Sequence, residues 1–276
     1  MKKIISCVML AVTLLVSSTA YAATSMSIII DGTSVASDAK PEFKDNRTMV
    51  PLRVISENLG AKVAWSKSEV TVIKDGMKIV LKTDSAVAVK NGKAVQLDVK
   101  PYAKNNRVLV PLRFIAETFG CSVDYSHSTV SVESAPLVID GVPVKVMQNE
   151  FHMIMGGVVQ QISANALNEA IYRSFETNKG AKVDAPVDYS WTINLDTPES
   201  YYKNGQYDFL DNNGKSVQRY DIYSLQQPTT TSEVLLHDVT KNQWYVFSRD
   251  ARMAIDTLVE RAYANGSLKV ISNTVA

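Results

Sequence analysis

Short alternations of apolar and polar residues, separated by tight-turn dipeptides, run through the first half of the chain. Asp31-Gly32 follows one apolar stretch, and Asn91-Gly92 follows another. Asp-Gly and Asn-Gly favour two-residue turns whose central residues have positive φ. This half is therefore predicted to consist of small antiparallel hairpins.

A helical spacing of apolar residues interrupts these hairpins twice. Leu52, Ile55 and Leu59 fall at i, i+3 and i+7, which places them on one buried face of a short helix. Pro51 suits the first turn of that helix, and Gly60 suits its left-handed C-terminal end. The same arrangement returns later in the chain, so two such helices are predicted.

The second half, from about residue 135, has a different pattern. Apolar residues at helical spacing predict helices over residues 156–176 and 249–265. Stretches rich in β-branched and aromatic residues predict strands over residues 189–195, 207–210, 217–225, 234–239, 244–248 and 267–272. This order predicts an α+β domain with an antiparallel sheet packed on helices.

The pattern of the first half repeats at an offset of 60 residues, and residues 47–66 and 107–126 are identical at ten of twenty positions. The shared motif V-P-L-R-x-I-x-E-x-x-G supplies Pro51, Arg53, Glu57, Gly60, Pro111, Arg113, Glu117 and Gly120. Such self-similarity indicates an internal duplication, with units at about residues 26–85 and 86–134. The fold class predicted for this part is a two-repeat, antiparallel, β-rich domain with short helices.

The Arg and Glu of this motif stand four residues apart on each helix. An ion pair would be within reach, but Arg before Glu is the weaker order and both charges oppose the helix dipole. One hypothesis gives them tertiary roles, with the guanidinium on loop carbonyls and the carboxylate capping a turn. The other hypothesis is an anionic-ligand site in each unit, built on Arg53 and Arg113.

The motif, followed by V-x-W and a hairpin, resembles the copper amine oxidase N-terminal-like domain, also called the stalk domain, over about residues 26–134. The resemblance implies small antiparallel sheets wrapped on a helix. It also implies an accessory domain of exported bacterial proteins, including cell-wall hydrolases. Copper and the quinone cofactor belong to the oxidase's catalytic domain, which this chain is too short to contain. Tyr125 replaces the usual Trp, and Cys121 replaces a small residue.

The first residues have the features of a secretory signal peptide. Lys2 and Lys3 precede an apolar stretch at residues 4–16, and A-Y-A at residues 20–22 matches the small-x-small cleavage pattern. The apolar stretch is too short for a membrane anchor. We therefore expect a secreted protein, extracellular or associated with the bacterial cell envelope, with no membrane span after cleavage. The expected segments are a signal peptide at 1–22, a duplicated stalk domain at 23–134 and a C-terminal α+β domain at 135–276.

Composition excludes several classes of protein. The chain of 276 residues is 46% apolar and 21% charged, which is typical of globular proteins, and its formal net charge is +1. Loss of Lys2 and Lys3 with the signal peptide changes that charge to −1. A nucleic-acid binder usually needs a basic face, so no nucleic-acid partner is expected. Removal of the signal peptide also leaves Cys121 as a lone thiol, so no internal disulfide is expected.

The usual motifs of catalysis and metal binding are absent from the sequence. His127, His152 and His237 are far apart, with no second ligand at i+2 to i+4, so no zinc site is predicted. The sequence has no P-loop, Rossmann glycine pattern or G-x-S-x-G elbow. A pair of carboxylates for glycoside cleavage could come from Asp188, Asp196, Glu199, Asp208 and Asp221. No metal, cofactor or catalytic residue is predicted.

Aromatic residues are enriched between residues 189 and 247, where eleven of 59 residues are aromatic against 8% in the whole chain. Ordinary sheet packing would explain part of this enrichment. Tyr220 and Tyr223 differ by an odd number, so a regular strand would point them to opposite faces. A solvent-facing row of rings could bind sugars or a peptide. The candidate ligand-binding residues are Tyr201, Tyr202, Tyr220, Tyr223 and Trp244, with Tyr201 and Tyr202 expected in an exposed loop.

The sequence favours a secreted, non-enzymatic binding or scaffolding protein in which a stalk domain presents a C-terminal interaction domain. The expected partner is a cell-wall glycan or another envelope protein. Two alternatives remain open. A cell-wall hydrolase would show a deep cleft lined by converging carboxylates. A secreted protease inhibitor would show a protruding ordered loop, expected over residues 197–206.

Overall fold

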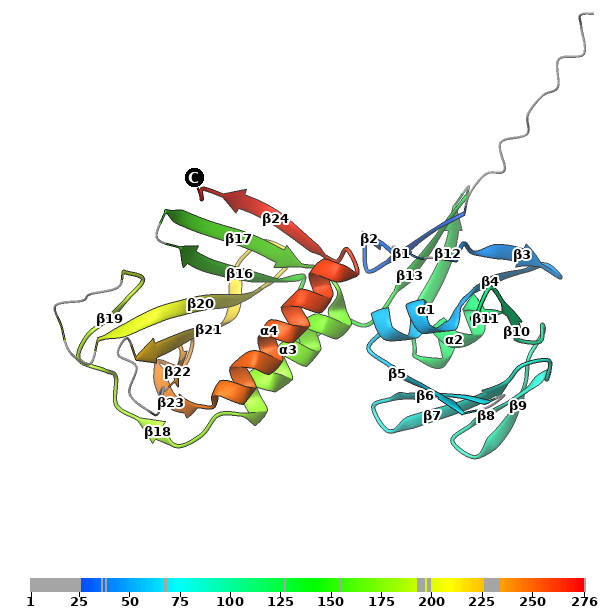
Figure 1. Cartoon of the computed structure of the whole chain (residues 1–276), viewed down its shortest axis with the longest axis horizontal. Helices are drawn as coiled ribbons and strands as arrows, with labels where there is room; N and C mark the ends of the chain where they lie inside the picture. The colour runs from blue at the N-terminus through cyan, green and yellow to red at the C-terminus, as the bar shows by residue number, and fades with distance from the viewer. Residues whose placement is uncertain are drawn as a thin grey trace, which may run out of the picture.

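The computed structural model describes residues 26–275, except residues 36, 38, 67, 68, 127, 154, 193–196, 198, 199 and 226–233. The expected signal peptide, His127, Asp196 and Glu199 therefore lie outside the described residues. Buried apolar side chains form one large cluster within residues 28–132 and another within residues 139–262. We call residues 26–134 the N-terminal region and residues 135–275 the C-terminal region; Figure 1 shows them side by side.

The N-terminal region consists of short strands and two seven-residue helices. In chain order they are β1 (Ser27–Ile30), β2 (Thr33–Ser34), β3 (Glu42–Lys44), β4 (Arg47–Pro51), α1 (Leu52–Asn58), β5 (Lys62–Ser66), β6 (Glu69–Lys74), β7 (Met77–Lys82), β8 (Val87–Lys90), β9 (Lys93–Gln96), β10 (Tyr102–Lys104), β11 (Arg107–Pro111), α2 (Leu112–Thr118), β12 (Ser122–Ser126) and β13 (Thr129–Glu133). The predicted Asp31-Gly32 and Asn91-Gly92 turns have positive φ at all four residues. Local turn chemistry thus places these hairpins correctly.

Three small sheets surround the two helices, in the orders β10-β11-β4-β3, β12-β13-β1-β2 and β5-β6-β7-β8-β9. In the first sheet, Val50 of β4 pairs with Val110 of β11, and Pro51 pairs with Leu109. Val50 and Val110 are also the positions that the 60-residue offset relates. The pairing is therefore symmetric about Val50 and Val110, and it is unchanged when the two strands exchange places.

The apolar face of each helix fills the core between these sheets. Leu52, Ile55 and Leu59 are completely buried, as the helical spacing predicts. Gly60 ends α1 with a φ of +82°, a conformation that side chains disfavour. Cys121 packs in the same core, and burial raises the pKa of its thiol to about 11.

The C-terminal region contains one large sheet and two longer helices. Its elements are β14 (Val138–Ile139), β15 (Val142–Pro143), β16 (Val146–Met153), β17 (Gly156–Ile162), α3 (Asn165–Thr177), β18 (Lys182–Val183), β19 (Tyr189–Ser190), β20 (Tyr201–Leu210), β21 (Ser216–Leu225), β22 (Val234–Asp238), β23 (Gln243–Phe247), α4 (Arg249–Ala264) and β24 (Leu268–Asn273). The order in the sheet is β18-β23-β22-β21-β20-β16-β17-β24, with β19 parallel to β20 and the other pairs antiparallel. Helices α3 and α4 lie next to each other across one face (Figure 1). This is the α+β class that the sequence predicts.

Two predicted elements of this region are wrong. Residues 156–162 form strand β17 and not the first turns of a helix, because Val158, Gln160 and Ile162 alternate inward while β17 pairs with both β16 and β24. The helix begins only at Asn165. The loop expected at residues 197–206 is also shorter, since β20 already begins at Tyr201 and pairs with β21. The protruding loop that would favour an inhibitor is therefore not formed by residues 201–206.

A buried carboxylate joins the two regions. Asp31, at the first hairpin turn, is only 7% exposed. Its side chain accepts hydrogen bonds from the backbone N–H and the hydroxyl of Ser134, and from the backbone N–H of Asn165. Asn165 is the first residue of α3, whose own N-cap residue offers no side-chain bond. Asp31 thus caps a helix of the other region and fixes the junction.

Candidate functional site

A groove of about 400 Å³ opens in the C-terminal region between α4 and the large sheet. The sheet side of this groove is lined by Asn149, Gln160, Tyr202, Asn204 and Tyr207, and the helix side by Arg252, Asp256 and Glu260. Its volume lies in the range of small-molecule pockets, roughly 300–1,000 Å³.

A glycine and a bulge in β20 shape the floor of the groove. The pairing of β20 with β21 shifts between Lys203 and Gly205, which changes the direction of the strand there. A Cβ atom on Gly205 would lie only 3.2 Å from Cε2 of the Tyr207 ring. A side chain at residue 205 would therefore crowd the Tyr207 ring, which packs close to the strand at this point.

The Tyr207 hydroxyl is a polar group without a partner. Tyr207 is only 5% exposed. Among the described residues, its hydroxyl makes no hydrogen bond, but it is not one of the fully buried polar atoms without a partner, so it is open to solvent in the groove. Burial raises the pKa of Tyr207, and the nearby Asp256 carboxylate raises this pKa further while Arg252 lowers it. This hydroxyl is available to a ligand in the groove.

The helix wall carries three charged residues, one per turn of α4. Arg252 Nη1 donates to Ser224 Oγ at 3.2 Å, while Arg252 Nε lies 3.8 Å from Asp256 Oδ2. Burial is the main cause that raises the pKa of Asp256; Glu260 raises it too, and Arg252 opposes both. The wall therefore contains a half-buried carboxylate that its single cation only partly compensates.

The sheet wall offers amide groups. Gln160 Nε2 donates to Asn149 Oδ1 at 2.9 Å, and Asn149 Nδ2 donates to the Gln206 carbonyl at 3.2 Å. Ser224 Oγ donates to Asn204 Oδ1 at 2.6 Å. Within the described part of the chain, two side-chain atoms of this wall, Gln160 Oε1 and Asn204 Nδ2, have no hydrogen-bond partner in the protein. The wall can therefore both accept a hydrogen bond from a ligand and donate one to it.

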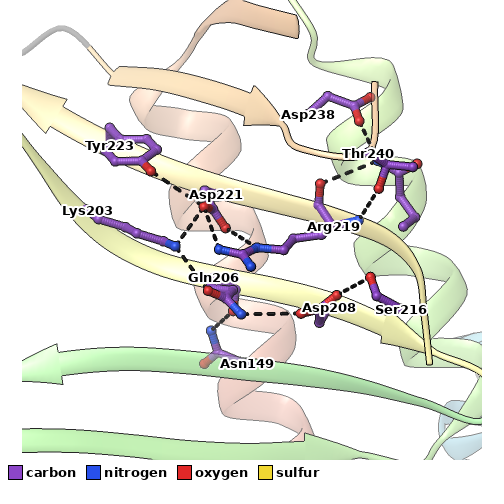
Figure 2. Close-up of polar contacts among 11 residues, drawn as sticks. Asn149, Lys203, Gln206, Asp208, Ser216, Arg219, Asp221, Tyr223, Asp238 and Thr240 are labelled. Atoms are coloured by element: carbon purple, nitrogen blue, oxygen red, sulfur yellow. Dashed lines mark hydrogen bonds and ion pairs between the residues drawn. The ribbon is translucent and has the colours of Figure 1, made fainter. Parts of the chain in front are cut away.

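The opposite face of the sheet holds a different polar cluster, which Figure 2 shows with the helices behind the strands. Lys203 Nζ lies 2.6 Å from Asp221 Oδ2, and Arg219 donates two bonds of 3.0 Å to the same carboxylate. Lys203 and Asp221 are both buried. Burial lowers the pKa of Lys203, Arg219 adds to this effect, and Asp221 opposes it. We call Lys203, Arg219 and Asp221 the ion triad.

The ion triad is closed by its surroundings. Lys203 Nζ also donates to Gln206 Oε1 at 3.0 Å and lies 4.4 Å from the centre of the Trp191 ring. The Tyr223 hydroxyl lies 3.5 Å from Asp221 Oδ2. Each charged group thus has partners within the protein. The triad ties β20 to β21, and both of its cations are bonded to the Asp221 carboxylate.

In the N-terminal region, the motif arginines lie over aromatic rings. The Arg53 guanidinium is 5.7 Å from the centre of the Trp65 ring, and Nε is 3.8 Å from Glu57. In the second unit, Arg113 lies 5.3 Å from the centre of the Tyr125 ring and 3.6 Å from Glu117. Both arginines thus lie over an aromatic ring of a neighbouring strand. Tyr125 thus contacts Arg113 as Trp65 contacts Arg53.

Residues 29–134 match the family model of the copper amine oxidase N-terminal domain. This match confirms the family resemblance that the V-P-L-R motif indicates. The matched model describes the non-catalytic N-terminal domain of copper amine oxidases, which is compatible with the absence of enzymatic activity. Among the described residues, no three His, Cys, Asp or Glu side chains lie together as a metal site would require, so they do not fit a copper centre.

Four of the five aromatic candidates are buried, so the expected row of solvent-facing rings is wrong. Tyr220 stacks on Phe175 at 4.5 Å in the core under the helices. Tyr223 and Trp244 pack together at 5.0 Å on the other face of the sheet, where Tyr201 joins them. The opposite orientation predicted for Tyr220 and Tyr223 is confirmed. Burial at two packed interfaces explains the aromatic enrichment.

Tyr202 alone among these candidates lines the groove, as a half-buried residue of β20. Its hydroxyl donates to the carbonyl of His152 at 2.9 Å. His152 itself stacks on Trp191, and His237 stacks on Trp244. Sequence reasoning missed Tyr207 and the three charged residues of α4. The signal that could have found Tyr207 is Gly205 inside a strand, since such a glycine marks a close approach.

No helix in the described part of the chain is long and apolar enough to cross a membrane.

Proposed function

We propose that this protein is a secreted, non-enzymatic binding protein of the bacterial cell envelope, and that the groove beside α4 binds a glycan. The observation that carries the proposal is the Tyr207 hydroxyl, which belongs to a nearly buried side chain, has no partner among the described residues and is open to solvent in the groove. A ligand with hydroxyl groups in the groove would bond this group directly in place of water.

The chemistry of the groove suits a sugar. A sugar presents several hydroxyls, each a donor and an acceptor, and apolar ring faces between them. The groove offers acceptors at Asp256 and Gln160, donors at Asn204 and Arg252, and a half-buried aromatic ring at Tyr202. Its volume of about 400 Å³ is enough for a small ligand of one or two rings.

The other features of the chain agree with an exported accessory protein. The first 22 residues have the pattern of a signal peptide. The copper amine oxidase N-terminal domain, which we infer to be a duplication, would hold the groove away from the site of attachment. The symmetric register of β4 and β11 supports this duplication. The bonds of Asp31 to Ser134 and Asn165 would keep the two regions in one orientation.

A cell-wall hydrolase is the second candidate, because two carboxylates line the groove. However, Asp256 and Glu260 stand one turn apart on the same helix and therefore form one wall. Glycoside hydrolases place two carboxyl groups on either side of the scissile bond, about 5–5.5 or 6.5–9.5 Å apart. The facing wall of this groove carries the amides Asn149 and Gln160 instead, which favours binding over cleavage.

A retention experiment tests the proposal. The exported chain is mixed with purified cell-wall sacculi, and the bound fraction and released sugars are measured. We expect retention without released sugars. Tyr207→Phe should weaken binding about two- to tenfold, the effect of one hydrogen bond of about 0.5–1.5 kcal/mol. The matched control is Tyr263→Phe, which removes an exposed hydroxyl of α4 and should change nothing.

Other outcomes would contradict the proposal. Released sugars that disappear in Asp256→Asn would make the protein a hydrolase. Absence of both retention and release would show that the groove does not bind wall glycan.

A further inference from the structure

The groove has more negative than positive charge on its helix wall. Asp256 and Glu260 face one arginine, Arg252. The guanidinium of Arg252 donates to the Ser224 hydroxyl, and its Nε lies 3.8 Å from Asp256, beyond hydrogen-bond distance. In the described part of the chain, Glu260 makes no ion pair.

The remaining groups around the groove do not balance this charge. His152 also lines the groove, but its Nε2 lies 2.9 Å from Oε1 of Glu150, a residue that does not line the groove. Asn149, Gln160 and Asn204 are neutral amides, and Tyr202 and Tyr207 are neutral phenols. A ligand that places a positive charge at this wall would therefore gain attraction that no protein group provides.

The partial burial of Asp256 also favours a positively charged group in the ligand. Its pKa is raised chiefly because burial disfavours the ionised form, and Glu260 adds to the effect. A cation beside Asp256 would stabilise its ionised carboxylate, whereas a neutral acetamide group would not. The half-buried carboxylate therefore distinguishes a free amine from an acetylated one.

The number of acceptors matches an ammonium group. A primary ammonium has three N–H donors and no acceptor. The carboxylates of Asp256 and Glu260 supply two acceptors, and the unpartnered oxygen of Tyr207 supplies a third. Asp256, Glu260 and Tyr207 all line the same groove.

We propose that the groove selects a glycan whose amino sugar carries a free primary amine, and that Asp256, Glu260 and Tyr207 bind the ammonium. This inference rests on the proposed glycan-binding function. It adds the chemical class of the ligand, an amino sugar without its acetyl group.

The test compares two oligosaccharides that differ only in acetylation. Binding of a glucosamine tetramer and of an N-acetylglucosamine tetramer to the exported chain is measured by calorimetry at pH 6, where a primary amine is protonated. We expect the glucosamine tetramer to bind at least tenfold more tightly, and this preference to fall at high salt. Asp256→Asn combined with Glu260→Gln should remove the preference. Asp250→Asn, at an exposed position of α4 outside the groove, should keep it.

The possible outcomes distinguish a failure of this inference from a failure of the proposed glycan binding. Equal or tighter binding of the acetylated tetramer would overturn the inference and leave glycan binding intact. Binding of neither tetramer, together with no retention on sacculi, would overturn both. A preference that survives the double substitution would show that the carboxylates do not bind the amine. Equally tight binding of a tetralysine peptide would show that the groove recognises a cation without its sugar, which also contradicts the proposal.

Discussion

Charged groups on the two sides of the large sheet differ in how completely other protein groups pair with them. On one face, the carboxylate of Asp221 meets Lys203 and Arg219 at 2.6–3.0 Å, and the cluster is complete within the protein (Figure 2). On the other face, Asp256 lies 3.8 Å from its arginine, and the Tyr207 hydroxyl has no partner in the part that the structure describes. The closed cluster is expected to stabilise the strands, and the open groove is expected to bind a ligand.

Breaking the ion triad should have the largest effect. Asp221→Ala leaves Lys203 buried without its counter-ion, which costs about 3–5 kcal/mol in the free energy of unfolding. Chemical denaturation measures this loss, and binding per folded molecule should not change. The control Asp184→Asn alters an exposed carboxylate and should leave the unfolding midpoint unchanged. Weaker glycan binding by folded Asp221→Ala would contradict the division between the two faces.

Filling the floor of the groove should have an intermediate effect. Gly205→Ala brings a Cβ within 3.2 Å of the Tyr207 ring, so that ring must move. We expect a loss of about 1–3 kcal/mol in stability and weaker retention on sacculi. In a Tyr207→Ala background the added methyl meets no ring, so the stability cost should largely disappear. A full cost in that background would mean that the strand itself, and not the ring, needs the glycine.

Replacement of a buried polar side chain outside the groove should change stability and leave binding unchanged. Asn168 in α3 is fully buried, and both of its side-chain polar atoms lack a partner among the described residues. Asn168→Leu should raise the free energy of unfolding by about 1–2 kcal/mol, because an unsatisfied buried group is removed. Binding should not change. Asn168→Asp, which adds a charge at the same place, should lower stability; a gain in stability would show that the site is not apolar.

Asp256→Asn should have the smallest effect, and one that depends on pH. Because the folded-state pKa of Asp256 is raised, the folded protein is penalised when this carboxyl ionises. Its contribution to stability is complete below the unfolded pKa and is lost as pH rises through the raised value. The substitution should therefore increase the melting temperature at pH 7 and have little effect at pH 3. An increase of the same size at both pH values would show that ionisation is not the cause.

Much of the fold follows from local sequence. The Asp-Gly and Asn-Gly turns, the buried stripe of α1 and the order of strands β20 to β23 are set by neighbours close in the chain. Strand β17 could not be predicted in this way, because its pairing with β24 joins residues more than a hundred positions apart. The apolar spacing in residues 156–162 fits either structure, and the sheet decides between them.

The groove could not be predicted from the sequence for a similar reason. Its residues come from β16, β17, β20 and α4, and only the fold brings them together. Arg252, Asp256 and Glu260 have the spacing of an ordinary solvated helix face. The search for exposed aromatic rings found Tyr202 but missed Tyr207, because burial and a missing partner are properties of the structure alone.

The most direct test of the proposed glycan-binding groove is a nuclear magnetic resonance titration of residues 23–276 with soluble fragments of partly deacetylated cell-wall glycan. The account predicts that shifted backbone amides cluster around Asn204, Tyr207 and Asp256, with no change around Lys203 and Asp221 on the other face. Shifts confined to the ion triad, or no saturable shifts at all, would contradict it.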